Sequence, residues 1–183
     1  MACKNVLLRF FVVLPLMAFV AVGLYGADRA KTDRFLSRVA TDPVSLDFEI
    51  SQENVAGVIA RGSLLYFKGR YFVQSDVYRV YCDSLCKYTV DDYTMEAVYE
   101  HVDPSSGDVF SNPSLIFSAL SSSVEFEFPS KGDCPSKARY TDASNGNVYI
   151  FKLTNLRFQD SAPSDDEFRP ADLGPKYVIT DLR

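Results

Sequence analysis

Side chains suited to acid–base or nucleophilic chemistry are scarce in this chain, because His101 is its only histidine. A triad of serine, histidine and an acid therefore has one possible base. His101 stands at a predicted strand end with no recognisable nucleophile motif beside it, so we interpret it as a surface residue. The acidic run at 165–167 lacks the alternating oxygen ligands and the glycine of a calcium loop, and is interpreted as a solvated loop. We expect no catalytic residue, no metal site and no cofactor, and predict that the protein is not an enzyme.

Three cysteines follow the N-terminal segment: Cys82, Cys86 and Cys134. If residues 83–85 form a hairpin loop, the Cα atoms of Cys82 and Cys86 lie about 4.5 to 5.5 Å apart, within disulfide range. A structural Cys82–Cys86 bridge is the prediction. A redox pair is a weaker interpretation, since that chemistry favours two intervening residues at a helix N-terminus. Cys134 could instead pair with either residue, so the pairing stays open.

The N-terminus has the pattern of a cleavable secretory signal peptide. Lys4 and Arg9 precede an apolar run over 10–24, and the small residues Gly26 and Ala27 follow it. The run is shorter than the roughly 20 residues of a membrane span. We predict a signal peptide over residues 1–26 and one exported, soluble domain over 27–183.

The charge balance bears on the class of partner. The whole chain has a net charge of −5, and the predicted leader holds basic residues but no acidic one, so the mature domain is more acidic still. That sign opposes binding to a phosphate backbone, and we expect no nucleic-acid partner.

The histidine and the cysteines must be positioned by secondary structure. The hydrophobic pattern predicts that most of this structure is β-strand. Apolar positions favour a short amphipathic helix over 28–40, and the strict alternation over 44–51 is typical of a strand with one buried face. The runs 55–67 and 71–81 flank a glycine-containing turn, as in a hairpin. Further predicted strands are 87–90, 94–101, 124–128, 137–141, 148–158 and 177–180, with a second short helix over 114–120 and a loop over 159–172.

The order of these elements and several local strings resemble the periplasmic outer-membrane lipoprotein carrier family, the LolA-like proteins. The strings are GSLLYFKGRYF at 62–72, Asp83 followed by Tyr88, SNPSLI at 111–116, and Phe168 followed by VITDLR at 178–183. The resemblance covers most of the predicted mature chain. It implies a mostly β fold, an open, curved antiparallel half-barrel with a few short covering helices, whose concave face holds lipoprotein acyl chains.

The resemblance also suggests which residues bind the ligand. Lys68 corresponds to the family's basic position at the end of a strand, where an arginine is common, and Phe72 to the phenylalanine just beyond the turn. Tyr88 stands where a tryptophan is usual. The full set expected to line or gate the cavity is Phe48, Ile50, Leu64, Tyr66, Lys68, Phe72, Tyr88 and Leu115. Leu64, Tyr66 and Phe72 would look the same as ordinary core residues, and Lys68 as a solvated charge.

The function implied is that of a periplasmic carrier or chaperone. Burial of an acyl chain in apolar surroundings is worth about 0.8 kcal/mol per CH₂, so a lipid-modified protein needs shielding to cross water. The implied partners are acylated lipoproteins, an inner-membrane release complex and an outer-membrane acceptor, with the carrier as a monomer. The alternative is a sensor or regulatory half-barrel domain that detects lipoproteins or another apolar ligand.

Overall fold

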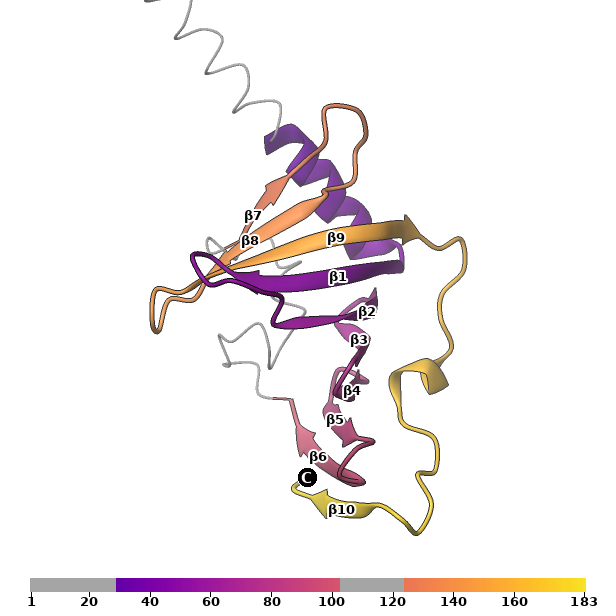
Figure 1. Ribbon diagram of the computed structural model, residues 1–183. Helices are drawn as coiled ribbons and strands as arrows, with labels where there is room; N and C mark the ends of the chain where they lie inside the picture. The colour runs from indigo at the N-terminus through magenta and orange to yellow at the C-terminus, as the bar shows by residue number, and fades with distance from the viewer. Residues whose placement is uncertain (1–28, 103–123) are drawn as a thin grey trace, which may run out of the picture.

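The computed structural model describes residues 29–102 and 124–183 (Figure 1). The predicted signal peptide, the predicted helix over 114–120 and the predicted ligand-binding residue Leu115 lie outside the described residues. Within them, one α-helix over residues 29–41 accompanies a single sheet of ten strands.

The sheet is open, because each of its two edge strands pairs on one side only. The strand order is β10-β6-β5-β4-β3-β2-β1-β9-β8-β7. The strands are β1 (Val44–Gln52), β2 (Ala60–Phe67), β3 (Arg70–Ser75), β4 (Tyr78–Cys82), β5 (Cys86–Asp91), β6 (Glu96–His101), β7 (Val124–Glu127), β8 (Lys137–Thr141), β9 (Val148–Phe158) and β10 (Val178–Asp181). All neighbours are antiparallel except β10, which runs parallel to β6. The predicted fold class, a mostly β open half-barrel with few helices, is confirmed.

The helix packs against one face of the sheet, which we call the inner face. Its apolar side chains Phe35 and Val39 are each 2% exposed and belong to the main core cluster. The ring of Phe35 makes edge contacts with Phe126 of β7 and with Phe158 at the end of β9, at centroid distances of 5.3 and 6.1 Å. Pro43 follows the helix and disfavours helical backbone before it, so the chain turns directly into β1.

The opposite, outer face has a smaller core of its own. Tyr81, Tyr88, Val90 and Ala97 are buried there. They lie under a segment that leaves β9, crosses the sheet and ends in β10, which we call the C-terminal strap, residues 159–177 (Figure 1). The strap includes a short 3₁₀ helix, η2 (Asp165–Phe168).

Several contacts hold the C-terminal strap to the outer face, among them an ion pair between Arg70 and Asp165. Phe168 is fully buried, with the guanidinium of Arg70 4.6 Å from its ring centroid. Arg169 forms an ion pair with Asp83 at 2.8 Å. Farther along, the hydroxyl of Tyr177 donates a hydrogen bond to Asp92 at 2.6 Å.

Three expectations about the strands differ from the structure. The predicted strand 55–67 is shorter, since β2 begins at Ala60. The predicted strand 71–81 is two strands, because Ser75 Oγ accepts hydrogen bonds from the backbone amides of Val77 and Tyr78 and turns the chain there. The half-barrel was expected to be antiparallel, but the C-terminal strap carries the final strand across the sheet so that it reaches β6 in parallel.

Candidate functional site

Four of the predicted ligand-binding residues lie together on the inner face of β1 and β2. Leu46 stands opposite Leu64 and Val44 opposite Tyr66, which places Phe48 and Ile50 of β1 on the same face. Ile50 and Leu64 are 6% and 5% exposed, whereas Phe48 and Tyr66 are half-buried at the edge of the cluster. The period-two alternation of β1 accounts for this grouping.

The apolar surface continues across β3 and β4 through residues that the predicted site did not include. Val73 stands opposite Leu64, and Val80 stands opposite Val73. Tyr71 and Cys82 form the adjacent pair and are 2% and 1% exposed. Their signal was present in the alternation of 71–81, but the turn at Ser75 had to be known before their face could be assigned.

Tyrosine hydroxyls give this surface a limited polar character without charge. Burial raises the pKa of Tyr66, against a smaller lowering by a backbone hydrogen bond with Gly69. Burial, followed by interaction with Cys82, raises the pKa of Tyr71 far above its ordinary value. Both side chains therefore stay neutral at physiological pH.

The apolar part of the inner face ends at β5 and β6. Lys87 of β5 stands opposite Cys82, and its amino group forms an ion pair at 2.9 Å with Glu100 of β6. The Lys87 side chain is 19% exposed. A charged pair thus borders the apolar strip formed by β1 to β4.

The described helix makes its specific contacts on the other side of that strip. Lys31 donates to the carbonyl oxygen of Pro129, Arg34 pairs with Asp133 at 3.5 Å, and Arg38 lies 3.9 Å from the ring centroid of Phe158. These partners belong to β9 and to the connection between β7 and β8. The helix is therefore fastened over β7 to β9.

Lys68 occupies the turn between β2 and β3 and is exposed. Lys68 and Gly69 both have positive φ, at 50° and 80°, as a two-residue type I′ hairpin requires. The Lys68 amino group lies 5.0 Å from the ring centroid of Phe67, whose side chain is on the outer face because Tyr66 is on the inner one. The turn therefore places the predicted gating charge beside the outer face.

Phe72 and Tyr88 do not lie on the same face of the sheet as Leu64 and Tyr66, so the predicted set of ligand-binding residues does not form one surface. Phe72 stands opposite Leu65, one residue from Leu64, and a shift of one residue in a strand changes the face. Phe72 stacks on Tyr81 with centroids 4.6 Å apart, and Tyr88 contacts Tyr99 edge-on at 5.0 Å. These rings form one row across β3 to β6 on the outer face.

The predicted Cys82–Cys86 disulfide is also not found, since both cysteines are free. The turn is not a three-residue loop between the two cysteines. Cys82 stands opposite Lys87, and the Asp83 amide donates to the Cys86 carbonyl oxygen at 3.2 Å, so Cys86 pairs with Asp83 and only residues 84 and 85 form the turn. Asp83 Oδ1 accepts the backbone amides of Leu85 and Cys86. Cys82 and Cys86 therefore point to opposite faces of the sheet. Cys134 is free as well.

Cys86 instead pairs across strands with the only histidine. The Sγ atom of Cys86 lies 3.9 Å from Nδ1 of His101, which is exposed. Sequence reasoning did not bring these two residues together, because their pairing depends on the β5–β6 register. Across residues 29–102 and 124–183, no group of three or more His, Cys, Asp or Glu side chains is arranged to hold a metal ion.

Comparisons with known proteins establish a fold likeness only. No protein-family model matches the chain, and no curated protein matches it. A crystal structure of an uncharacterized conserved protein from Thermus thermophilus matches with a TM-score of 0.50 over 85% of this chain and 99% of that one, at 9% identity. None of the helices in the described ranges combines the length and apolarity needed to cross a membrane.

Proposed function

We propose that this protein is a periplasmic LolA-like carrier that binds the acyl chains of lipoproteins against its inner face and takes no part in catalysis. One observation supports the proposal above others. The described helix makes its polar contacts over β7 to β9. The apolar strip of the same core cluster continues from β1 to β4, where Phe48 and Tyr66 are half-buried and the other side chains are buried.

The chemistry of the strip suits an acyl chain. Its side chains are aliphatic or neutral aromatic apart from Cys82, and no buried polar or charged residue occurs in the described part of the chain. Each methylene moved from water to such a surface contributes about 0.8 kcal/mol, without directional bonds. A long chain can then be held firmly and still be passed on by exchange, which requires no covalent step.

The ion pair of Lys87 and Glu100 gives the strip a boundary. A hydrocarbon chain gains nothing by displacing a paired charge, because the separated ions would then lose their partner in a half-buried place. Bound acyl chains are therefore confined to β1 through β4, with Tyr66 and Phe48 at the margin. We further propose that cargo arrives from an inner-membrane release complex and leaves to an outer-membrane acceptor.

Tyr66→Glu tests the proposal, with Leu65→Glu as its matched control. Both residues are half-buried neighbours on β2, but Tyr66 is on the inner face and Leu65 on the outer face. The measurement is binding of a fluorescent acylated peptide to purified protein. We expect Tyr66→Glu to weaken binding by about tenfold or more, because a carboxylate in the strip must be desolvated by the ligand.

The control should bind like the parent protein, and circular dichroism should show that both variants are folded. If Tyr66→Glu folds and binds the peptide as tightly as the parent, the inner face is not the acyl site. If the parent itself neither binds the peptide nor co-purifies with acylated species in native mass spectrometry, the carrier function is rejected.

A further inference from the structure

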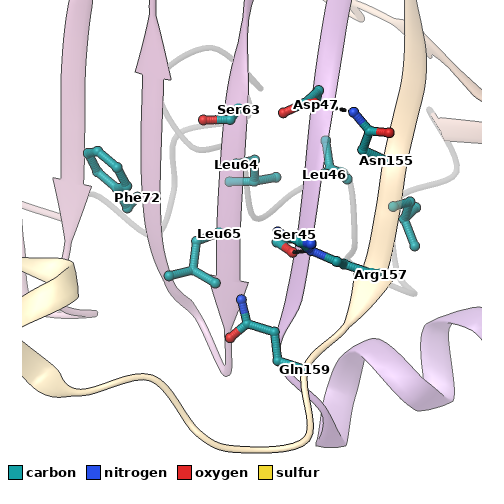
Figure 2. A pocket seen from close by; sticks show the side chains of 11 residues that line it. Ser45, Leu46, Asp47, Ser63, Leu64, Leu65, Phe72, Asn155, Arg157 and Gln159 are labelled. Carbon is teal, nitrogen blue, oxygen red and sulfur yellow. Dashed lines mark hydrogen bonds between the residues drawn. The ribbon is translucent and has the colours of Figure 1, made fainter.

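A second candidate site lies on the outer face, apart from the acyl-binding strip. A cavity of about 560 Å³ opens over β3, β2, β1 and β9, beside the start of the C-terminal strap (Figure 2). Its volume is in the range of small-molecule sites. The side chains that line it are Ser45, Asp47, Ser63, Leu65, Phe72, Asn155, Arg157 and Gln159, while Leu46, Leu64 and Leu156 contribute to its floor.

The strand register gives this cavity an apolar end and a polar end. Phe72 stands opposite Leu65, Leu65 opposite Ser45, and Ser45 opposite Arg157, so four strands contribute one continuous row. Figure 2 shows Phe72 and Leu65 on one side and Arg157 on the other. An occupant therefore meets an aromatic ring and an aliphatic side chain at one end and hydrogen-bonding groups at the other.

A bulge in β9 builds the polar end. The β1–β9 register shifts between Ser45 and Asp47, and Asn155 has a φ of 52°. The amide of Asn155 donates to Asp47 Oδ2 at 2.6 Å, and Nε of Arg157 donates to Ser45 Oγ at 3.2 Å. These bonds hold a carboxylate and a guanidinium in place at the rim, without an ion pair between them in the described structure.

The same groups keep hydrogen-bonding capacity for a ligand. Among the described residues, the terminal nitrogens of Arg157, the Oδ1 atom of Asp47 and the side chains of Ser63 and Gln159 have no hydrogen-bond partner. Arginine only donates, a carboxylate only accepts, and a hydroxyl or an amide does both. The cavity thus offers donors and acceptors next to each other.

The two opposite charges disfavour a ligand that carries a single charge. An anion drawn to Arg157 meets the carboxylate of Asp47, and a cation drawn to Asp47 meets the guanidinium of Arg157. A neutral molecule with several hydroxyl groups avoids both penalties, since each hydroxyl donates to one partner and accepts from another. The C–H face of a sugar ring also packs on an apolar surface such as Phe72 and Leu65.

We infer that this outer-face cavity binds a neutral saccharide, with its hydroxyls on Asp47, Arg157 and Gln159 and a ring face toward Leu65 and Phe72. The side chains expected to hold the sugar lie on the outer face, opposite the acyl-binding strip, although Leu46 and Leu64 of that strip contribute to the cavity floor. A variant that loses acyl binding is expected to keep sugar binding, and a variant that loses sugar binding is expected to keep acyl binding.

The experiment uses the purified protein with three neutral disaccharides: cellobiose, maltose and lactose. Saturation-transfer NMR detects binding, and backbone amide shifts on labelled protein locate it. We expect at least one sugar to bind, with shifts confined to β1, β2 and β9 around Asp47, Ser63 and Arg157. Asp47→Ala and Arg157→Ala should each weaken binding by about tenfold.

The matched controls are Glu49→Ala and Lys152→Ala, which remove an ion pair of 3.3 Å from the outer face of the same two strands, outside the cavity. They should leave sugar binding unchanged. Ser63→Phe fills the cavity without removing a charge and should abolish sugar binding. This variant keeps the inference testable if Asp47→Ala does not fold. Absence of binding by all three sugars, shifts elsewhere, or binding that survives Ser63→Phe would overturn the inference.

Discussion

Gly62→Ala is the substitution whose cost follows most directly from the structure. Gly62 lies in β2 between Phe48 of β1 and Ser75 of β3. A Cβ atom at this position would stand 2.1 Å from the carbonyl oxygen of Gln74 and 2.9 Å from Cζ of Phe48. The first of these atoms belongs to the backbone, so relief requires β3 to move.

The expected loss of stability is the sum of three effects. Strain from overpacking costs about 1–3 kcal/mol. If β3 moves far enough to lose one hydrogen bond of the β2–β3 ladder, a further ~1 kcal/mol is lost. Alanine restricts the unfolded chain and offsets this by about 0.4–1 kcal/mol. The free energy of unfolding should therefore fall by about 2 kcal/mol.

Urea unfolding followed by circular dichroism measures this change. With a dependence on urea of about 1–3 kcal/mol per molar, the midpoint should fall by roughly 1 M. Ser63→Ala is the control, since Ser63 is the next residue of β2 and its side chain points to the outer face. We expect it to change stability by no more than about 0.5 kcal/mol.

The same substitution made in the Phe48→Ala protein shows which of the two close atoms causes the loss of stability. Phe48→Ala removes the 2.9 Å contact but leaves the carbonyl of Gln74 in place. Gly62→Ala should therefore cost nearly the same in the Phe48→Ala protein as in the parent, with a coupling energy near zero. If Gly62→Ala is harmless in the parent, or only in the Phe48→Ala protein, the reasoning from the backbone contact is refuted.

Three further predictions concern the turn, the acid response and the strap. Lys68→Asn should raise the free energy of unfolding by about 0.5–1 kcal/mol, because asparagine tolerates the positive φ of this turn better; a lower urea midpoint would contradict the type I′ assignment. Burial tends to raise the pKa of Asp83, but the Cys86 backbone amide and other hydrogen bonds outweigh it and lower the pKa. The stability that ionised Asp83 contributes is then present above about pH 4 and is lost as the pH falls through the lower folded pKa. Asp83→Asn should therefore be less stable than the parent at pH 7, and the two proteins should have the same stability in thermal unfolding at acidic pH. Phe168→Ala should abolish hydrogen-exchange protection in the C-terminal strap, yet lower global stability by less than the 3–5 kcal/mol typical of a core phenylalanine, because the strap can open locally; a full-sized loss would show that it unfolds with the sheet.

Local pattern was sufficient to predict most strands. The predicted segments 44–51, 137–141 and 148–158 agree with β1, β8 and β9 to within a residue at each end. Alternation of apolar and polar residues marks a half-buried strand without knowledge of its partners. The helix before β1 was predicted for the same kind of reason, since Phe35 and Val39 recur at helical spacing.

Register was the part that local pattern did not determine. Phe72 and Tyr88 were assigned to the ligand cavity from the family resemblance, and the disulfide to Cys82 and Cys86 because a three-residue hairpin loop was assumed between them. A change of one residue in a turn moves every later side chain to the other face. The bulge at Asn155 and the parallel pairing of β10 depend on contacts between distant segments and left no local signal.

The central position of β1 has a consequence for how the chain folds. Strands β2 to β6 pair with their sequence neighbours through short turns, and so do β7 to β9. β1 joins these two parts, and its contact with β9 links residues 108 positions apart, as in the Asn155–Asp47 hydrogen bond. Contacts of such sequence separation form slowly, since the loop must close before they contribute. A chain made from its N-terminus therefore keeps one edge of β1 unpaired until nearly all of it exists, and this edge is where we expect aggregation to begin if β9 is delayed.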